Sequence, residues 1–183
     1  VKNGYRFKPK MDELIRDGTD GYIVTYGEMV HRCLDAVERL REEGMYVGLV
    51  NKSTLNKTDK RMMEKVGKSP FVLVVESQNY KTGLGSRFGT WLLEMGYHPK
   101  YKHLGVTKHG ITGLWEQSDH QGLDSYSIAK NLRRLVILTR KKNTETLDKW
   151  ADGTASLKKK NKSLGDIDTG SKKGAACENP REE

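Results

Sequence analysis

The alternation of apolar and polar positions predicts a series of strands and helices, and its clearest unit covers residues 71–95. Residues 71–75 form an unbroken apolar run, which is typical of a strand buried on both faces. After Gly83, large apolar side chains recur at helical spacing, so one face of a helix should cover a sheet. These positions are Leu84, Phe88, Trp91, Leu92 and Met95.

The same kind of pattern recurs on both sides of this unit. Further short strands are expected at residues 22–26, 46–50 and 101–106. Further helices are expected at residues 28–43, from about residue 59, and at residues 125–138. Gly44 should end the first of these helices, because glycine tolerates the left-handed conformation. Asp59 suits the positively polarised start of the second.

Strands that alternate with helices of this length favour right-handed β-α-β crossovers and a mainly parallel sheet. We therefore expect an α/β three-layer sandwich, with a small, mainly parallel sheet of four to five strands covered by helices on both faces. A chain of 183 residues is long enough for one such domain and too short for two ordinary ones.

The segment of residues 139–183 differs in composition from the rest of the chain. It has few large apolar side chains and several basic runs, such as Arg140-Lys141-Lys142. Such a segment buries too little apolar area to offset the entropy of ordering. We expect the compact part to end near Leu138 and residues 139–183 to form a basic, disordered tail.

Several classes of protein are disfavoured by composition. No apolar run is long enough to span a bilayer, and residues 1–10 lack the apolar core of a signal peptide, so we expect a soluble protein. Cys33 and Cys177 lie far apart, which fits a reducing compartment such as the cytoplasm better than a disulfide framework. The five histidines show no metal-ligand spacing, so no metal site is expected.

Several short motifs carry a resemblance to a known family. Residues 75–85 are similar to a strand end Val-Glu-Glu-His (or -Asn) followed by a Gly-Gly-x-Gly turn. Residues 18–30 resemble Gly-x-Asp, an apolar strand and Gly-x-x-Val, and residues 54–59 stand where Thr-Ile-Lys-Pro-Leu-Asp is usual. Residues 108–113 stand where Arg-Phe-Gly-x-Ser-Gly is usual, and residues 122–128 resemble the start of a last helix. In this order, the motifs resemble the C-terminal domain of the transketolase superfamily.

The resemblance covers roughly residues 5–138 and implies the same fold that the periodicity predicts. Relatives by resemblance are transketolase, deoxyxylulose-phosphate synthase and the beta subunits of 2-oxoacid dehydrogenases. It implies a linker from a preceding domain at residues 1–17, the domain itself at residues 18–138, and a non-catalytic role in assembly or regulation. The parent assembly would be a thiamine-diphosphate-dependent transferase or 2-oxoacid dehydrogenase, in which the pyrimidine-binding and diphosphate-binding domains or subunits are the partners, in a dimer.

Residues that bind thiamine diphosphate are missing from the expected positions. The cofactor normally needs Gly-Asp-Gly after a strand, with a later Asn, to hold the Mg²⁺ that bridges its phosphates. The nearest match, Gly165-Asp166-Ile167, lies in the polar tail without a preceding strand. We therefore expect this chain to bind no cofactor, to hold no catalytic residue and to be inactive by itself, with thiamine diphosphate and Mg²⁺ bound elsewhere in the parent assembly.

Candidate contact residues gather after the strand at residues 71–75. The candidates for an anion contact or a domain-interface contact are Glu76, Gln78, Asn79, Gly83, Leu84, Gly85 and His109. Glu76 could pair with a basic residue across an interface or cap local backbone amides. The turn at residues 83–85 could cradle an anion, but tight helix packing is the favoured interpretation, since Phe88 replaces the glycine of a dinucleotide fingerprint. His109 could be functional or could pack as the aromatic residue of the family does.

A second hypothesis is a stand-alone binding module whose basic tail holds a polyanion or another partner. The net charge of +9 allows non-specific phosphate contacts. Without a recognised nucleic-acid module or a basic segment interleaved with stacking aromatics, a nucleic-acid function is not favoured. Glu116, Asp119 and His120 are expected to form a solvated polar loop.

Overall fold

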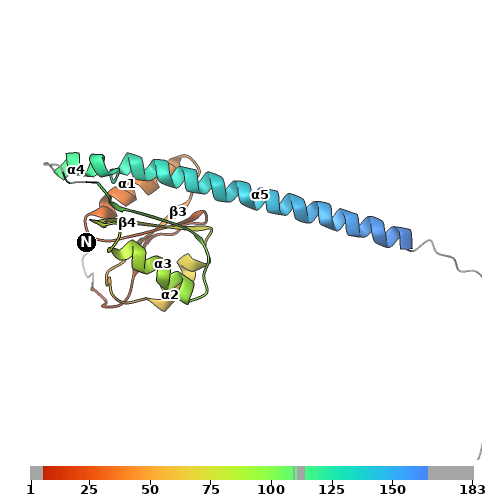
Figure 1. Cartoon of the computed structure of the whole chain (residues 1–183), viewed down its shortest axis with the longest axis horizontal. Coiled ribbons are helices and arrows are strands. Elements are labelled where there is room, and N and C mark those ends of the chain that lie inside the picture. The colour runs from red at the N-terminus through yellow and green to blue at the C-terminus, as the bar shows by residue number, and fades with distance from the viewer. Residues whose placement is uncertain (1–5, 109, 111–113, 165–183) are drawn as a thin grey trace, which may run out of the picture. The chain divides into compact units, whose positions relative to one another are not determined.

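A five-stranded sheet lies between two layers of helices in the computed structural model of the chain (Figure 1). The structure describes residues 6–108, 110 and 114–164. The strands are β1 (Glu13–Arg16), β2 (Gly21–Thr25), β3 (Val47–Asn51), β4 (Phe71–Asn79) and β5 (Lys100–Val106). The helices are α1 (Met29–Glu42), α2 (Lys60–Gly67), α3 (Leu84–Glu94), α4 (Leu114–Gln121) and α5 (Ser125–Leu164).

The strand order in the sheet is β1-β3-β2-β4-β5. Strands β3, β2, β4 and β5 are parallel, whereas β1 pairs antiparallel with β3. In register, Ile23 of the central strand β2 lies opposite Leu49 on one side and Leu73 on the other. Because four strands run in the same direction, the residues that follow them meet at one edge of the sheet.

Two separate apolar cores confirm the expected three-layer sandwich. Ile23 and Leu73 belong to the core under α1 and the first part of α5, whereas Val24 and Val74 belong to the core under α2 and α3. Successive side chains of a strand point to opposite faces, so both faces must be covered when all of them are apolar. The observed α/β fold is therefore the one that the periodicity predicts.

Strand β1 lies inside the segment 1–17 that the sequence suggested as a linker. Its backbone pairs with β3, so that Glu13 lies opposite Asn51 and Leu14 opposite Val50. Three of its four side chains are exposed, which leaves no apolar alternation for sequence reasoning to detect. The folded domain therefore begins before residue 18, and the boundary expected there is corrected to include β1.

Helix α4 replaces the polar loop expected around Glu116, Asp119 and His120. The interpretation as a loop was wrong because this eight-residue helix carries mostly polar side chains and shows no clear apolar stripe. Glu116 lies in its first turn, where a negative charge favours a helix, and it is exposed, as is Asp119. Ser118 and Gln121 turn inward and are buried.

Helix α5 continues beyond the expected end at Leu138 to Leu164. Thr139 is buried and Arg140 pairs with Asp20, so the compact unit that holds the sheet extends to Asn143, and another unit starts at Thr144. Residues 139–164 thus continue α5 in the structure, where the sequence predicted a disordered tail, and the lysine and leucine residues among them are good helix formers. The remaining tail residues, 165–183, lie outside the described residues. In the described part of the chain, every helix is too short or too polar to traverse a lipid bilayer.

Candidate functional site

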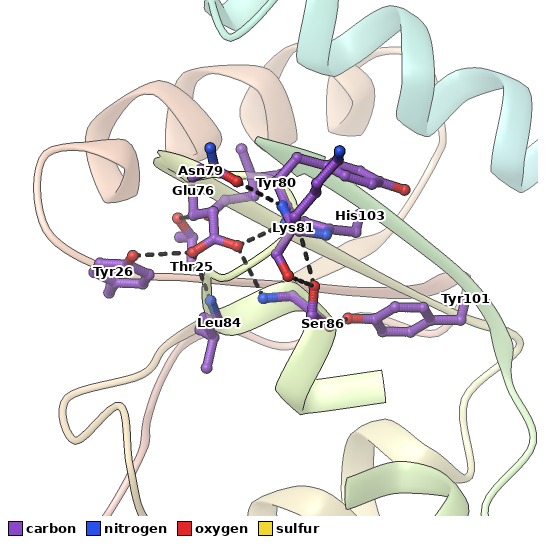
Figure 2. A network of polar contacts seen from close by, with 12 residues as sticks. Thr25, Tyr26, Glu76, Asn79, Tyr80, Lys81, Leu84, Ser86, Tyr101 and His103 are labelled. Atoms are coloured by element: carbon purple, nitrogen blue, oxygen red, sulfur yellow. Dashed lines mark hydrogen bonds and ion pairs between the residues drawn. The ribbon is translucent and has the colours of Figure 1, made fainter. Parts of the chain in front are cut away.

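A buried carboxylate, Glu76, stands near the carboxyl end of β4. It directly follows the apolar residues 71–75 of the strand, and it is 0% exposed. A buried charge is costly unless hydrogen bonds or ion pairs compensate it. The contacts of Glu76 therefore decide what this site can do (Figure 2).

The first contacts of Glu76 are with the start of α3. Its Oε2 accepts a hydrogen bond from the N–H of Leu84 at 2.7 Å, and its Oε1 accepts one from the N–H of Gly85 at 2.9 Å. The N-cap residue, Gly83, has no side chain that could serve these amides. Glu76 thus caps the helix from a neighbouring strand, and its negative charge faces the positive end of the helix dipole.

The remaining contacts of Glu76 come from two aromatic side chains (Figure 2). Nε2 of His103, on β5, lies 2.6 Å from Oε1, and the hydroxyl of Tyr26, directly after β2, donates to Oε2 at 3.0 Å. Because an ionised carboxylate can only accept, Nε2 of His103 carries the proton of this bond. One carboxylate therefore links the ends of β2 and β4, the middle of β5 and the start of α3.

The electrostatics of the site favour an ionised Glu76. Burial by itself raises the pKa of this carboxyl group, but the hydrogen bonds from His103, Gly85, Leu84 and Tyr26 outweigh burial and hold the pKa below its ordinary value. Burial, and then the nearby charge of Glu76, raise the pKa of Tyr26, so this phenol stays protonated and remains a donor. At this site, the ionised carboxylate of Glu76 is surrounded by hydrogen-bond donors that stabilise its negative charge.

Gly83 and Gly85 make this close packing possible. A Cβ atom on Gly83 would lie 2.3 Å from Oε2 of Glu76, and a Cβ atom on Gly85 would lie 2.2 Å from the ring of His103. Neither distance is compatible with a side chain. The Gly-x-Gly turn therefore serves the approach of Glu76 and His103 to the helix start, which supports the packing interpretation of this motif.

The arrangement suits a structural cap better than a reactive group. Both oxygens of Glu76 accept two hydrogen bonds each. The side chain of His103 is 5% exposed, and its ring stacks on Tyr80 with the ring centroids 4.4 Å apart. The amides of Leu84 and Gly85 already donate to Glu76, so they are not open to an external anion. No group of three or more potential metal-binding side chains occurs within the described residues.

The other candidate residues lie closer to the surface. Gln78 and Asn79 are exposed at the end of β4, and Oδ1 of Asn79 accepts a hydrogen bond from the N–H of Lys81 at 2.9 Å. Gln78 and Asn79 share a cavity of about 280 Å³ with other residues of this edge of the sheet. These are Tyr26, Leu55, Thr82, Gly83, Leu84 and Arg87. His109 lies outside the described residues.

Sequence reasoning missed Tyr26 and His103, the two side-chain donors to Glu76. A signal for Tyr26 was present, because it comes directly after the apolar residues of a buried parallel strand, just as Glu76 does. His103 was harder to find, since a single histidine in a strand shows no spacing pattern. Its role depends on the register that places it opposite Val74 of β4.

A second buried charge at the same edge of the sheet was also missed. Lys52, directly after β3, is 1% exposed, and its Nζ lies 3.0 Å from Oδ1 and 3.1 Å from Oδ2 of Asp12. Nζ also donates to the carbonyl oxygen of Lys57 at 2.6 Å. Burial raises the pKa of Asp12, while the hydrogen bond and the charge of Lys52 oppose this rise. This pair attaches the segment before β1 to the loop after β3.

Comparison with known proteins identifies relatives over most of the folded part. The family model described as the C-terminal domain of transketolase matches residues 12–128. The 1-deoxy-D-xylulose-5-phosphate synthase of Bacillus velezensis is 30% identical over 131 residues, which cover 68% of this chain and 20% of the synthase. One of the subunits of the apulose-4-phosphate transketolase of Actinobacillus succinogenes is 27% identical over 128 residues, which cover 68% of this chain and 41% of that protein.

A solved structure agrees with these matches. A split-gene transketolase, described as an inactive beta4 tetramer, superimposes with a TM-score of 0.70 at 22% identity, over 76% of this chain and 46% of the other. At this identity the likeness establishes the fold. The chain spans about one fifth of the length of the synthases that it matches. Since the family model covers well over half of the chain, we conclude that the chain belongs to the family of transketolase C-terminal domains.

Proposed function

We propose that this chain is the C-terminal domain, or a separate C-terminal subunit, of a transketolase-like enzyme that depends on thiamine diphosphate. Its role is in assembly or regulation, and the chemistry takes place on other domains. Membership of the family supports the type of parent enzyme. The short coverage of the synthases is what a single domain of a longer enzyme would give.

The observation that carries the non-catalytic assignment is the environment of Glu76. An acid or base in catalysis must reach the proton that it transfers. Glu76 is buried, its pKa is low, and its oxygens accept hydrogen bonds from Leu84, Gly85, His103 and Tyr26. A carboxylate with these contacts stabilises the fold and is a poor general base.

The partners in this proposal are the pyrimidine-binding and diphosphate-binding domains or subunits of the same enzyme, which hold thiamine diphosphate and Mg²⁺. The assembly is a dimer and works in the cytoplasm. The relative from the apulose-4-phosphate transketolase is by name one part of a multi-subunit enzyme, which supports an arrangement with separate subunits. The free thiol of the buried Cys33 is compatible with a reducing compartment.

Calorimetry tests the proposal. Thiamine diphosphate and Mg²⁺ are titrated into this chain, into the polypeptide that carries the two cofactor domains, and into their mixture. We expect no binding to this chain alone and binding in the presence of the cofactor domains. Micromolar binding to the isolated chain, or its turnover of a sugar phosphate or 2-oxoacid, would contradict the proposal. The alternative of a stand-alone polyanion-binding module has no specific observation in its favour.

A further inference from the structure

The chain before β1 is firmly attached to the domain through a segment that we call the strap, residues 10–12. The N–H of Lys10 donates to Oγ1 of Thr54 at 3.0 Å, and the hydroxyl of Ser53 donates to the carbonyl of Met11 at 3.0 Å. The N–H of Asp12 donates to Oδ2 of Asp59 at 2.9 Å. Every residue of the strap is thus hydrogen-bonded to the segment between β3 and α2.

The ion pair of Asp12 and Lys52 fixes the strap on its inner side. The side chains are 1% and 0% exposed, respectively, so water does not weaken their attraction. Asp59, which binds the strap, also caps α2 by accepting hydrogen bonds from the N–H groups of Arg61 and Met62. The strap is therefore positioned by the same residues that position α2, and it has a fixed direction relative to the sheet.

Around the strap, apolar side chains are exposed at close intervals along the chain. Phe7, Met11 and Leu14 are 56%, 42% and 37% exposed. Met11 and Leu14 line a cavity of about 300 Å³ together with Arg6, Lys8 and Arg61. We call Met11, Leu14, Arg6, Lys8 and Arg61 the strap surface. Grouped apolar side chains beside an open cavity are typical of a surface that another polypeptide covers.

The charges of the strap surface are unbalanced. Three cationic side chains, those of Arg6, Lys8 and Arg61, line the cavity with the carboxylates of Glu13 and Asp12. Since Asp12 is paired with Lys52, the cations exceed the carboxylate of Glu13. A complementary partner would carry an apolar side chain that enters the cavity and acidic groups at its rim.

We propose that the strap surface is the face that contacts the cofactor-binding part of the parent enzyme, an inference that rests on the proposed function. The family match begins at residue 12, within the strap. In a C-terminal domain, the preceding part of the enzyme is joined to the chain before the strap, so it lies near the strap surface. About four fifths of each matched synthase lies outside the matched segment, which leaves a large partner to cover this face. The fixed strap then sets the orientation of the domain on its partner.

Binding between this chain and the polypeptide that carries the cofactor domains tests the inference. Met11→Asp introduces a charge at the cavity, and Arg61→Glu reverses a charge at its rim. A glutamate in the first turn of α2 suits the helix dipole, so the second variant should remain folded. Matched controls are Leu93→Asp, at a side chain that is 63% exposed on α3, and Arg134→Glu, at an exposed position of α5.

We expect Met11→Asp and Arg61→Glu to weaken binding by about tenfold or more, whereas the controls stay within about twofold of the unchanged chain. Circular dichroism verifies that each variant is folded. If the unchanged chain binds and all four variants bind equally well, the strap surface is not the interface. If the unchanged chain does not bind at all, the proposed function itself fails. Sedimentation of the chain alone adds a further test, because self-association that Met11→Asp abolishes would assign the surface to a second copy and overturn the inference.

Discussion

Nε2 of His103 lies 2.6 Å from Oε1 of Glu76, and this contact joins two adjacent strands through side chains in addition to their backbone pairing. The same carboxylate caps α3, so the side chain of Glu76 on β4 forms hydrogen bonds with both α3 and β5. A helix in this position usually relies on a local Ser, Thr, Asn or Asp for its N-cap. Here the cap comes from residue 76, which allows glycine at the turn.

Replacing Glu76 by glutamine should destabilise the domain by about 2 to 3 kcal/mol, because the amide group would face N–H donors and leave at least one of them unsatisfied. Urea unfolding followed by circular dichroism measures this loss. Glu94→Gln, at an exposed carboxylate near the end of α3, serves as the matched control and should leave the midpoint almost unchanged. Equal effects of the two substitutions would refute the role of Glu76 as a cap.

The contribution of Glu76 should also depend on pH. Its pKa in the folded chain is held below the ordinary value of 4.5, so the folded state binds fewer protons at this site than the unfolded state in that range. The stabilisation is therefore complete above the ordinary value and is lost as the pH falls through the lower, folded-state pKa. We expect the difference in unfolding free energy between the unchanged chain and Glu76→Gln to be constant near neutral pH and to narrow under acidic conditions. A difference in unfolding free energy that widens on acidification would contradict the lowered pKa of Glu76 in the folded chain.

Gly85→Ala should be strongly destabilising, because its Cβ atom would lie 2.2 Å from the His103 ring. The strain of such a contact typically costs about 1 to 3 kcal/mol. The effect of Gly85→Ala is measured by thermal unfolding in the unchanged chain and in a His103→Ala background. If the contact with the His103 ring is the cause, Gly85→Ala should destabilise the His103→Ala variant less than it destabilises the unchanged chain. Additive losses of stability from the two substitutions would exclude this clash as the cause.

Lys52→Met should cost about 3 to 5 kcal/mol, since it leaves the carboxylate of Asp12 buried without its cationic partner. The double variant Lys52→Met with Asp12→Leu should recover part of this loss, because no unpaired charge then remains. Lys68 and Glu64 form an exposed pair four residues apart on the chain, and Lys68→Met provides a control that should unfold like the unchanged chain. The comparison requires chemical denaturation of all three variants. No recovery in the double variant would contradict this account.

Cys33 should resist thiol reagents in the folded chain. Its side chain is fully buried, and burial raises the pKa of its thiol to about 12, so little thiolate forms near neutral pH. Labelling is measured on a Cys177→Ser variant, which leaves Cys33 as its one cysteine. We expect the extent of the reaction of Cys33 with a disulfide reagent to increase in parallel with unfolding by urea. Rapid labelling in buffer without urea would contradict this prediction and show that the core under α1 opens readily.

The elements that bury one or two faces were predictable from the sequence. Strand β4 and helix α3 were found because a buried sheet requires an apolar run and a helix on it requires regular spacing. Glu76 was found because it interrupts the apolar run at the edge where parallel strands end. These features depend on local pattern, which a single sequence contains.

The remaining features depend on long-range packing or on a weak pattern. His103 reaches Glu76 across 27 positions of sequence, and only the register of β5 against β4 brings them together. Lys52 was not noticed because lysine is rarely buried without a partner, and its partner Asp12 lies 40 positions away. Strand β1 is short and mostly exposed, and α5 extends past Leu138 on helix-forming composition without an apolar stripe.

The anchoring of residues 10–12 has a practical consequence for protein engineering. A junction that joins this domain to a carrier protein must be placed before Lys10. A domain that starts at Glu13 would lack Asp12 and leave the buried ammonium group of Lys52 without its carboxylate partner. A domain that starts at Met11 would already lose the hydrogen bond from the N–H of Lys10 to Thr54. A rigid spacer attached upstream of Lys10 would transmit its own direction to the sheet, so spacer length and stiffness would control how such a chimera is arranged.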